Sequence, residues 1–140
     1  MPVSLDERFE QLIAFLGSQL PAPVDQQAED DGSLMFTGGT PPQVVVHLTA
    51  AKVTVSEFAG VWQAPGQLIL RPRRVGTLLW PRLPETPLLN ALSALIKGAR
   101  DTRLARYRSC ESCGRKHPPE VPLSGGVCPA CSDVQNYRIH

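Results

Sequence analysis

The sequence predicts an α+β fold, in the order helix, antiparallel sheet of four or five strands, long helix and a small cysteine-containing module. Three observations predict it. Apolar residues recur at helical spacing over residues 5–20 and again over residues 88–99. Between them lie short β-branched segments whose connections are too short for crossover helices, which favours antiparallel pairing. All the cysteines follow the second helix, in two pairs.

The length and composition fit one compact domain with a small appendage. The chain has 140 residues, of which 42% are hydrophobic, and this is enough for a core of its own. No apolar run approaches the roughly 20 residues of a membrane span, and the N-terminus lacks the basic and apolar regions of a secretory signal. We therefore expect a cytoplasmic protein without membrane contact, in which paired cysteines bind metal rather than form disulfides.

The first helix is predicted from Ser4 to about Leu20. Ser4 and Glu7 form a capping box, in which the serine accepts from a free backbone N–H and the glutamate reaches back to the cap. Apolar positions follow at helical spacing, and Pro21 ends the helix. Residues 21–32 are acidic and contain proline, so we expect a solvated connector there.

Short segments rich in β-branched residues predict the strands. In Lys52–Phe58, Val53 and Val55 alternate with polar residues, as in a sheet with one solvated face. His47 and Glu57 are isolated polar residues in such segments, and the sequence places no catalytic partner near either. The predicted strands are Ser33–Thr37, Gln43–Thr49, Lys52–Phe58, Gln67–Arg71 and Thr77–Trp80.

A long second helix is predicted after Pro84. Thr86 is the expected N-cap, and Pro87 is the expected first helical residue because its missing N–H costs nothing there. An apolar stripe follows, and we expect it to cover the sheet. Its members are Leu88, Leu92, Leu95 and Ala99.

Four cysteines in two pairs predict a metal site. Cys110 and Cys113, then Cys128 and Cys131, give the spacing C-x2-C-x14-C-x2-C. Two residues between the cysteines of a pair let one backbone turn direct both sulfurs at one ion, and two such turns supply a tetrahedral Zn2+ with four thiolates. A four-thiolate site leaves no position for water or substrate, so the predicted zinc is structural rather than catalytic.

Residues 106–140 resemble the zinc-ribbon class of domains through these two cysteine pairs. The resemblance implies structural zinc on the four thiolates, with each pair at the turn of a β-hairpin. Gly114 suits the left-handed backbone that such a turn needs, whereas Ser132 stands where ribbons often have a second glycine. Tyr137 and Ile139 are expected to form a third short strand.

Three alternatives for the cysteines are less consistent with the sequence. Rubredoxin-type iron sites usually have glycine after both pairs and an aromatic-rich core, whereas Ser132 and sparse aromatic residues are found here. Two matched pairs argue against a dithiol redox switch. His117, Asn136 and His140 lack the spacing of an HNH nuclease.

Charge is unevenly distributed along the chain, although the net charge is only +1. Residues 1–31 hold seven acidic residues against one arginine, and residues 71–116 hold eleven basic residues against three acidic ones. Such asymmetry can indicate a polyanionic partner. Whether the acidic segment masks the basic one is a question that the sequence leaves open.

A basic run begins near the end of the second helix and continues into the cysteine loop. The helix dipole favours two or three basic residues in the last turns, but it does not explain a series that continues past the helix end. Clustering along a helix is the electrostatic footprint of a nucleic-acid site. The candidate phosphate-binding residues are Arg100, Arg103, Arg106, Arg108, Arg115 and Lys116.

The leading interpretation is a non-enzymatic protein in which zinc fixes the ribbon and arginines contact the phosphates of a nucleic acid. We expect an α+β domain over residues 1–105 and a zinc-ribbon domain over residues 106–140. The alternative is a protein-interaction module that docks on a larger assembly. No Walker loop, dinucleotide fingerprint, HExxH motif or nucleophile elbow is present, so no catalytic residue is assigned. The oligomeric state is left open.

Overall fold

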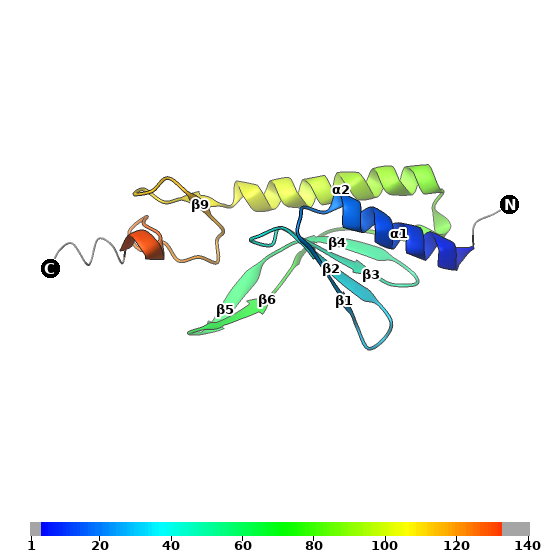
Figure 1. Ribbon diagram of the computed structural model, residues 1–140, viewed down its shortest axis with the longest axis horizontal. Helices are drawn as coiled ribbons and strands as arrows, with labels where there is room; N and C mark the ends of the chain where they lie inside the picture. Colours follow the sequence, from blue (N-terminus) through cyan, green and yellow to red (C-terminus); the bar gives the residue numbers. More distant parts are fainter. Residues whose placement is uncertain (1–3, 133–140) are drawn as a thin grey trace.

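The computed structural model describes residues 4–132 and confirms the predicted α+β architecture. Its elements follow the predicted order of helix, sheet, long helix and cysteine module (Figure 1). The helical elements are α1 (Leu5–Gln19), the short 3-10 helix η1 (Trp80–Arg82) and α2 (Glu85–Ala105). The strands are β1 (Val24–Ala28), β2 (Leu34–Gly38), β3 (Val44–Leu48), β4 (Val53–Glu57), β5 (Gly60–Ala64), β6 (Gln67–Leu70), β7 (Arg73–Leu78), β8 (Arg108–Ser109) and β9 (Lys116–His117).

The predicted first helix is confirmed, together with the serine half of its predicted capping box. The Ser4 side chain accepts a hydrogen bond of 3.1 Å from the backbone N–H of Glu7, which satisfies one of the free donors of the first turn. The Leu20 N–H donates to the carbonyl of Leu16 at 3.0 Å and closes the last turn. Helix α1 therefore begins and ends where its local sequence signals place it.

The main sheet of the described residues has five antiparallel strands, in the order β1-β2-β3-β4-β7. Strand β1 lies in the segment that was predicted to be a connector, and that expectation is wrong. Its register with β2 runs from Val24 opposite Gly38 to Ala28 opposite Leu34. Backbone pairing needs no apolar side chain, so a mostly exposed, polar strand can complete the edge of a sheet.

Strands β5 and β6 form a separate antiparallel hairpin, which extends away from the main sheet (Figure 1). The sequence predicted β6 but not β5, and it placed β6 in the main sheet. The last strand of the main sheet was predicted over Thr77–Trp80. It begins earlier, since β7 starts at Arg73. A methyl group added at Gly76 would lie 2.7 Å from Cδ2 of Leu95, so the glycine lets β7 lie directly against α2.

Helices α1 and α2 lie on the same side of the sheet, and the core lies between them and the strands (Figure 1). The predicted stripe of α2 contributes to it: Leu88, Leu92 and Ala99 are buried, and Leu95 packs against them. The other buried apolar residues of the core are Leu12, Leu16, Leu20, Phe36, Val44, Val46, Leu48, Val53, Val55, Trp80 and Ile96. Among the described residues, no helix has the length and apolar character that crossing a bilayer requires.

Helix α2 begins two residues earlier than predicted. Pro84, with φ of −60°, is the N-cap, and its carbonyl accepts from the Leu88 N–H at 3.0 Å. Thr86 therefore lies inside the first turn rather than at the cap. Proline fixes φ at a value compatible with the helix, so the chain can turn into α2 without a side-chain cap.

Candidate metal centre and basic surface

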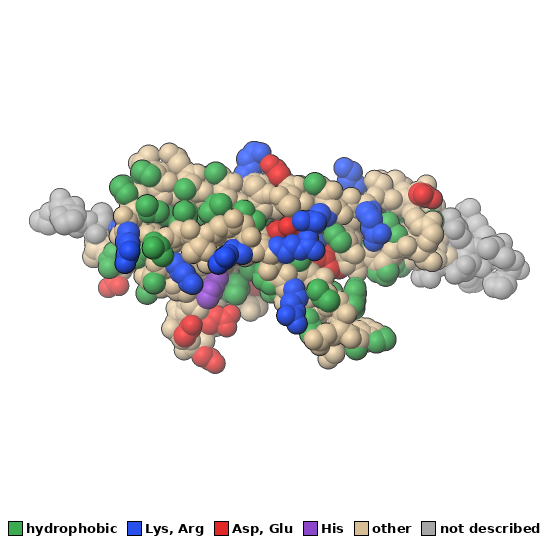
Figure 2. All heavy atoms as spheres, turned by 180° about the vertical axis from the view of Figure 1, so that it is seen from behind, with side chains coloured by type: hydrophobic (Ala, Val, Ile, Leu, Met, Phe, Trp, Pro, Cys, Tyr) green, Lys and Arg blue, Asp and Glu red, His purple; other side chains and the backbone are tan. Residues whose placement is uncertain are grey.

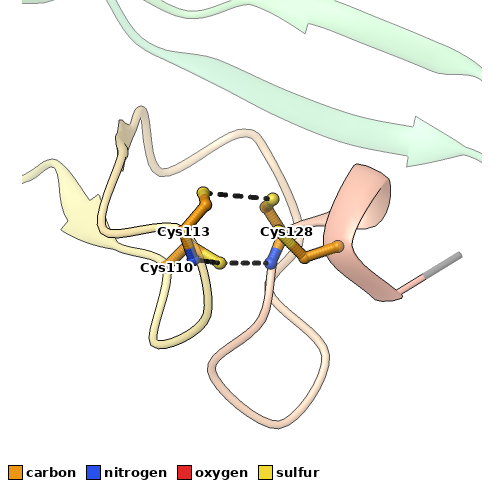
Figure 3. Close-up of side chains that lie close together, drawn as sticks. Cys110, Cys113 and Cys128 are labelled. Carbon is orange, nitrogen blue, oxygen red and sulfur yellow. Dashed lines mark hydrogen bonds between the residues drawn. The ribbon is translucent and has the colours of Figure 1, made fainter. Parts of the chain in front are cut away.

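The four cysteines come together at the end of the chain that the structure describes. Their sulfur atoms all lie within 4.8 Å of one another, and the sulfurs of Cys113 and Cys128 are 4.0 Å apart (Figure 3). Four sulfurs at the usual zinc–sulfur distance of about 2.3 Å are about 3.8 Å apart in a tetrahedron. The arrangement therefore fits a single metal ion, and the predicted ligand set is confirmed as a cluster.

The first pair lies on a β-hairpin, as predicted. Strands β8 and β9 pair through Ser109 opposite Lys116, and the Cys110 N–H donates to the carbonyl of Arg115 at 2.8 Å. Gly114 has φ of +74°, in the left-handed region where glycine carries no steric cost. Its N–H donates to the carbonyl of Cys110 at 2.9 Å and closes the turn.

The second pair does not lie on a hairpin turn, and that expectation is wrong. Residues 129–132 are helical, and the Ser132 N–H donates to the carbonyl of Cys128 at 2.8 Å. Two local features explain the difference. Pro129 favours the first turn of a helix, and Ser132 lacks the conformational freedom with which Gly114 turns the first pair back. The third strand that we expected near Tyr137 and Ile139 lies outside the described residues.

The sulfur of Cys110 accepts three backbone hydrogen bonds from described residues. It accepts from the backbone N–H groups of Ser112, Cys113 and Cys128 at 3.4, 3.5 and 3.3 Å, and Figure 3 shows the bond from Cys128. The N–H groups of Cys113 and Cys128 lower the pKa of Cys110 to about 6, because they stabilise the thiolate. In contrast, hydrogen bonding to the Cys128 side chain and burial raise the pKa of Cys131 to about 12. A metal ion would have to displace that proton on binding.

Glu111 and Gly126 join the two halves of the cysteine module. The Glu111 N–H donates to the carbonyl of Gly126 at 2.9 Å. Gly126 has φ of +81°, and a methyl group there would lie 2.6 Å from the carboxyl carbon of Glu111. A side chain at position 126 would therefore require the Glu111 carboxylate to move, and the positive φ would be unfavourable for any residue but glycine.

Glu120 attaches the cysteine module to the rest of the protein, and the sequence analysis missed it. Its carboxylate accepts from Nη1 of Arg103 at 2.8 Å and from the backbone N–H of Gly60 at 2.9 Å. Its carbonyl accepts from Nε1 of Trp62 at 2.9 Å. No local signal marks this residue, because its partners lie 17 to 60 positions away in the chain.

The predicted basic residues do not all lie on the surface. Arg103 is only 2% exposed, and its Nε donates to the carbonyl of Pro42 at 3.2 Å in addition to the bond with Glu120. Arg100 and Arg106 come three residues before and after it, so at about 100° per residue they lie on either side of the buried arginine. Arg103 is therefore not part of an exposed basic surface.

Glu57 is a neighbour of two of the other basic residues. Arg106 donates from Nε to its carboxylate at 2.7 Å, while 46% of the Arg106 side chain stays exposed. Arg73 is the cross-strand partner of Glu57 in the register of β4 and β7, so it lies on the same face. Figure 2 shows Lys and Arg side chains near the middle of one face of the molecule.

The remaining predicted residues lie elsewhere on the surface. Arg108, Arg115 and Lys116 are exposed on the β8–β9 hairpin, next to the cysteines. Arg100 is exposed on the other side of Arg103, where its Nε donates to Oε1 of Gln43 at 3.1 Å. We use the name basic surface for one set of residues: Arg73, Arg106, Arg108, Arg115 and Lys116.

His47, on the central strand β3, belongs to a small hydrogen-bonded chain. Its Nε2 lies 3.0 Å from Oγ of Ser33, whose hydroxyl donates to Asp31 at 2.6 Å. In a catalytic triad the histidine lies between serine and acid, whereas here the serine lies between the other two. In this order the Ser33 hydroxyl donates its proton to Asp31, so His47 does not act as a base toward it.

Comparison with protein-family models, with curated proteins and with solved structures gives no match for this chain.

Proposed function

We propose that this chain is a non-enzymatic, cytoplasmic zinc protein that binds nucleic acid through phosphate contacts. The observation that carries the proposal is that Arg106, two residues before Arg108 of the first cysteine hairpin, and Arg73 are both neighbours of Glu57. Nucleic-acid binding without base recognition needs several cations within reach of one backbone. The basic surface contains five basic residues, of which Arg106 is paired with Glu57.

Zinc is the metal that the ligand chemistry favours. Four thiolates in a tetrahedral arrangement select zinc or iron among biological metals, and structural zinc sites are typically closed by four cysteines. The metal would hold Arg108, two residues before Cys110, and Arg115, two residues after Cys113. Its proposed role is thus to fix part of the basic surface rather than to react.

Metal content tests the zinc proposal. Elemental analysis of purified protein should give one zinc per chain, and substitution by Co2+ should give the absorption of a tetrahedral thiolate site. The Cys110→Ser variant should lose the metal. A red, iron-containing protein would show instead that the four cysteines form a rubredoxin-type iron site.

Binding to labelled oligonucleotides at rising salt tests the nucleic-acid proposal. The logarithm of the binding constant for duplex DNA should fall linearly with the logarithm of salt, and each lost phosphate contact should reduce the slope by about 0.9. Arg108→Ala and Arg115→Ala should each weaken binding and reduce this slope. Lys52→Ala is the matched control, because Lys52 is an exposed cation in the β3–β4 turn, outside the basic surface. An absence of binding even at low salt would refute the proposal.

The β5–β6 hairpin favours a second candidate function, namely docking on a protein partner. Four of its apolar side chains are 43–51% exposed: Val61, Trp62, Leu68 and Leu70. Exposed apolar residues grouped on one element are typical of interaction sites. A purified complex of fixed stoichiometry that contains no nucleic acid and is lost in Leu68→Ser would favour this function over the first.

A further inference from the structure

The two tryptophans of the chain lie in opposite environments. Trp80 is 1% exposed in the core, whereas Trp62 is 51% exposed on β5. The indole N–H of Trp62 donates to the carbonyl of Glu120 at 2.9 Å. This bond holds the ring against the cysteine module while half of its surface remains open to a ligand.

Arg108 and Trp62 bind the same loop of the cysteine module. Nη2 of Arg108 donates to the carbonyl of Val121 at 3.4 Å, and the Trp62 indole binds the preceding carbonyl, that of Glu120. Consecutive residues are only about 3.8 Å apart along the chain. An aromatic ring and a guanidinium group from distant parts of the sequence therefore bind neighbouring carbonyls of one short segment.

A mostly apolar hollow of about 350 Å³ opens beside the Trp62 ring. Its charged lining residues, Arg103 and Glu120, already satisfy each other through an ion pair. The hollow thus offers stacking and apolar contact rather than polar recognition. Its other lining residues include Pro41, Pro42, Phe58, Leu68, Pro118 and Val121.

We infer that the nucleic acid is single-stranded and that a base stacks on Trp62 while Arg108 contacts the adjacent phosphate. This inference rests on the proposed function and specifies its ligand. In a duplex the bases stack on one another and offer no free face, whereas the unstacked bases of a single strand bind aromatic side chains next to cations. Stacking accepts any base because each has a π face, so this site would not select a sequence.

Tryptophan fluorescence provides a direct test in the unmodified protein. Because Trp80 is buried, quenching by a single-stranded oligonucleotide of about twelve nucleotides would report on Trp62. We expect strong quenching by the single strand and little by a duplex of the same length. Binding of the single strand without quenching would overturn the inference.

Three variants complete the test. Trp62→Ala should weaken single-strand binding roughly tenfold and leave duplex binding nearly unchanged. Trp62→Phe keeps an aromatic face and should retain most of the affinity. Val61→Ala is the matched control, because Val61 is 50% exposed on the same strand but points to the opposite face of the hairpin.

The outcomes separate this inference from the proposed function. Equal binding of both nucleic acids, unaffected by Trp62→Ala, would refute the stacking site while the phosphate proposal stands. If neither nucleic acid binds at low salt, both proposals fail, and a role of the hairpin in protein docking would be the remaining explanation. Trp62→Phe and the quenching experiment keep the test valid if Trp62→Ala does not fold.

Discussion

Arg103 and Glu120 form a buried ion pair that joins the long helix to the cysteine module. Nη1 of Arg103 lies 2.8 Å from both carboxylate oxygens of Glu120, and the two side chains are 2% and 9% exposed. The guanidinium carbon also lies 5.1 Å from the centroid of the Phe58 ring and 5.3 Å from that of Tyr107. Because the pair is almost fully buried, water cannot stabilise either charge, and each charge is stabilised chiefly by its partner.

Glu120→Gln should lower the free energy of unfolding by about 3 kcal/mol, because it leaves the Arg103 charge buried and uncompensated. Urea unfolding followed by circular dichroism measures this change. Asp101→Asn is the control: it breaks the Lys97–Asp101 pair, whose side chains are 77% and 58% exposed, and it should cost less than about 0.5 kcal/mol. Similar losses in both variants would mean that burial of the pair is unimportant.

Removal of the metal should unfold residues 108–132 and leave α1, the main sheet and α2 folded. The core of the α+β part contains none of the cysteines, whereas a module this small depends on its metal for folding. Hydrogen exchange before and after chelation should show loss of protection in the module alone. Trp62 should become more mobile as its bond to Glu120 is lost, and Trp80 should not change. Simultaneous loss of protection in α2 would show instead that the chain unfolds as one unit.

Several features that depend on near neighbours in the chain could be predicted from the sequence, although the cap of α2 and the turn at the second cysteine pair were not. The Ser4 cap involves a residue three positions away, and the stripe of α2 depends only on helical periodicity. The cysteine cluster was also predictable, because each pair is local and few arrangements satisfy four thiolates. In each case the prediction rests on residues only three or four positions apart in the sequence.

Features that depend on distant contacts could not be predicted in this way. Strand β1 has few apolar residues, and it is a strand because β2 supplies its backbone partners. Arg103 resembles its exposed neighbours on the helix, and only the folded chain places Glu120 and the carbonyl of Pro42 beside it. The hairpin of β5 and β6 depends likewise on Glu120, which lies 60 residues after Gly60 and 58 after Trp62.

Ser33→Ala should raise the pKa of Asp31. The hydroxyl and the backbone N–H of Ser33 both donate to this carboxylate, at 2.6 and 2.9 Å, and they hold its pKa below the usual range. Since the pKa is lower in the folded protein, the ionised carboxylate stabilises the fold above the ordinary value of about 3.9, and this contribution is lost as the pH falls through the folded value. NMR titration of the Asp31 side chain measures the shift. An identical midpoint in both proteins would rule out the hydroxyl as its main cause.

Gly114→Ala should weaken metal binding although no side chain lies in its way. A methyl group at this position has no heavy atom within 4 Å among the described residues, so the cost comes from the backbone, whose φ is +74°. A left-handed conformation costs a non-glycine residue roughly 1–2 kcal/mol, which is about tenfold in zinc affinity. Competition with a chelator of known affinity measures it. Gly17→Ala is the control, because Gly17 also has open space around it but lies in α1. That change should stabilise the protein by about 1 kcal/mol and leave zinc affinity unchanged, and a loss of zinc affinity in both variants would contradict the role assigned to the Gly114 turn.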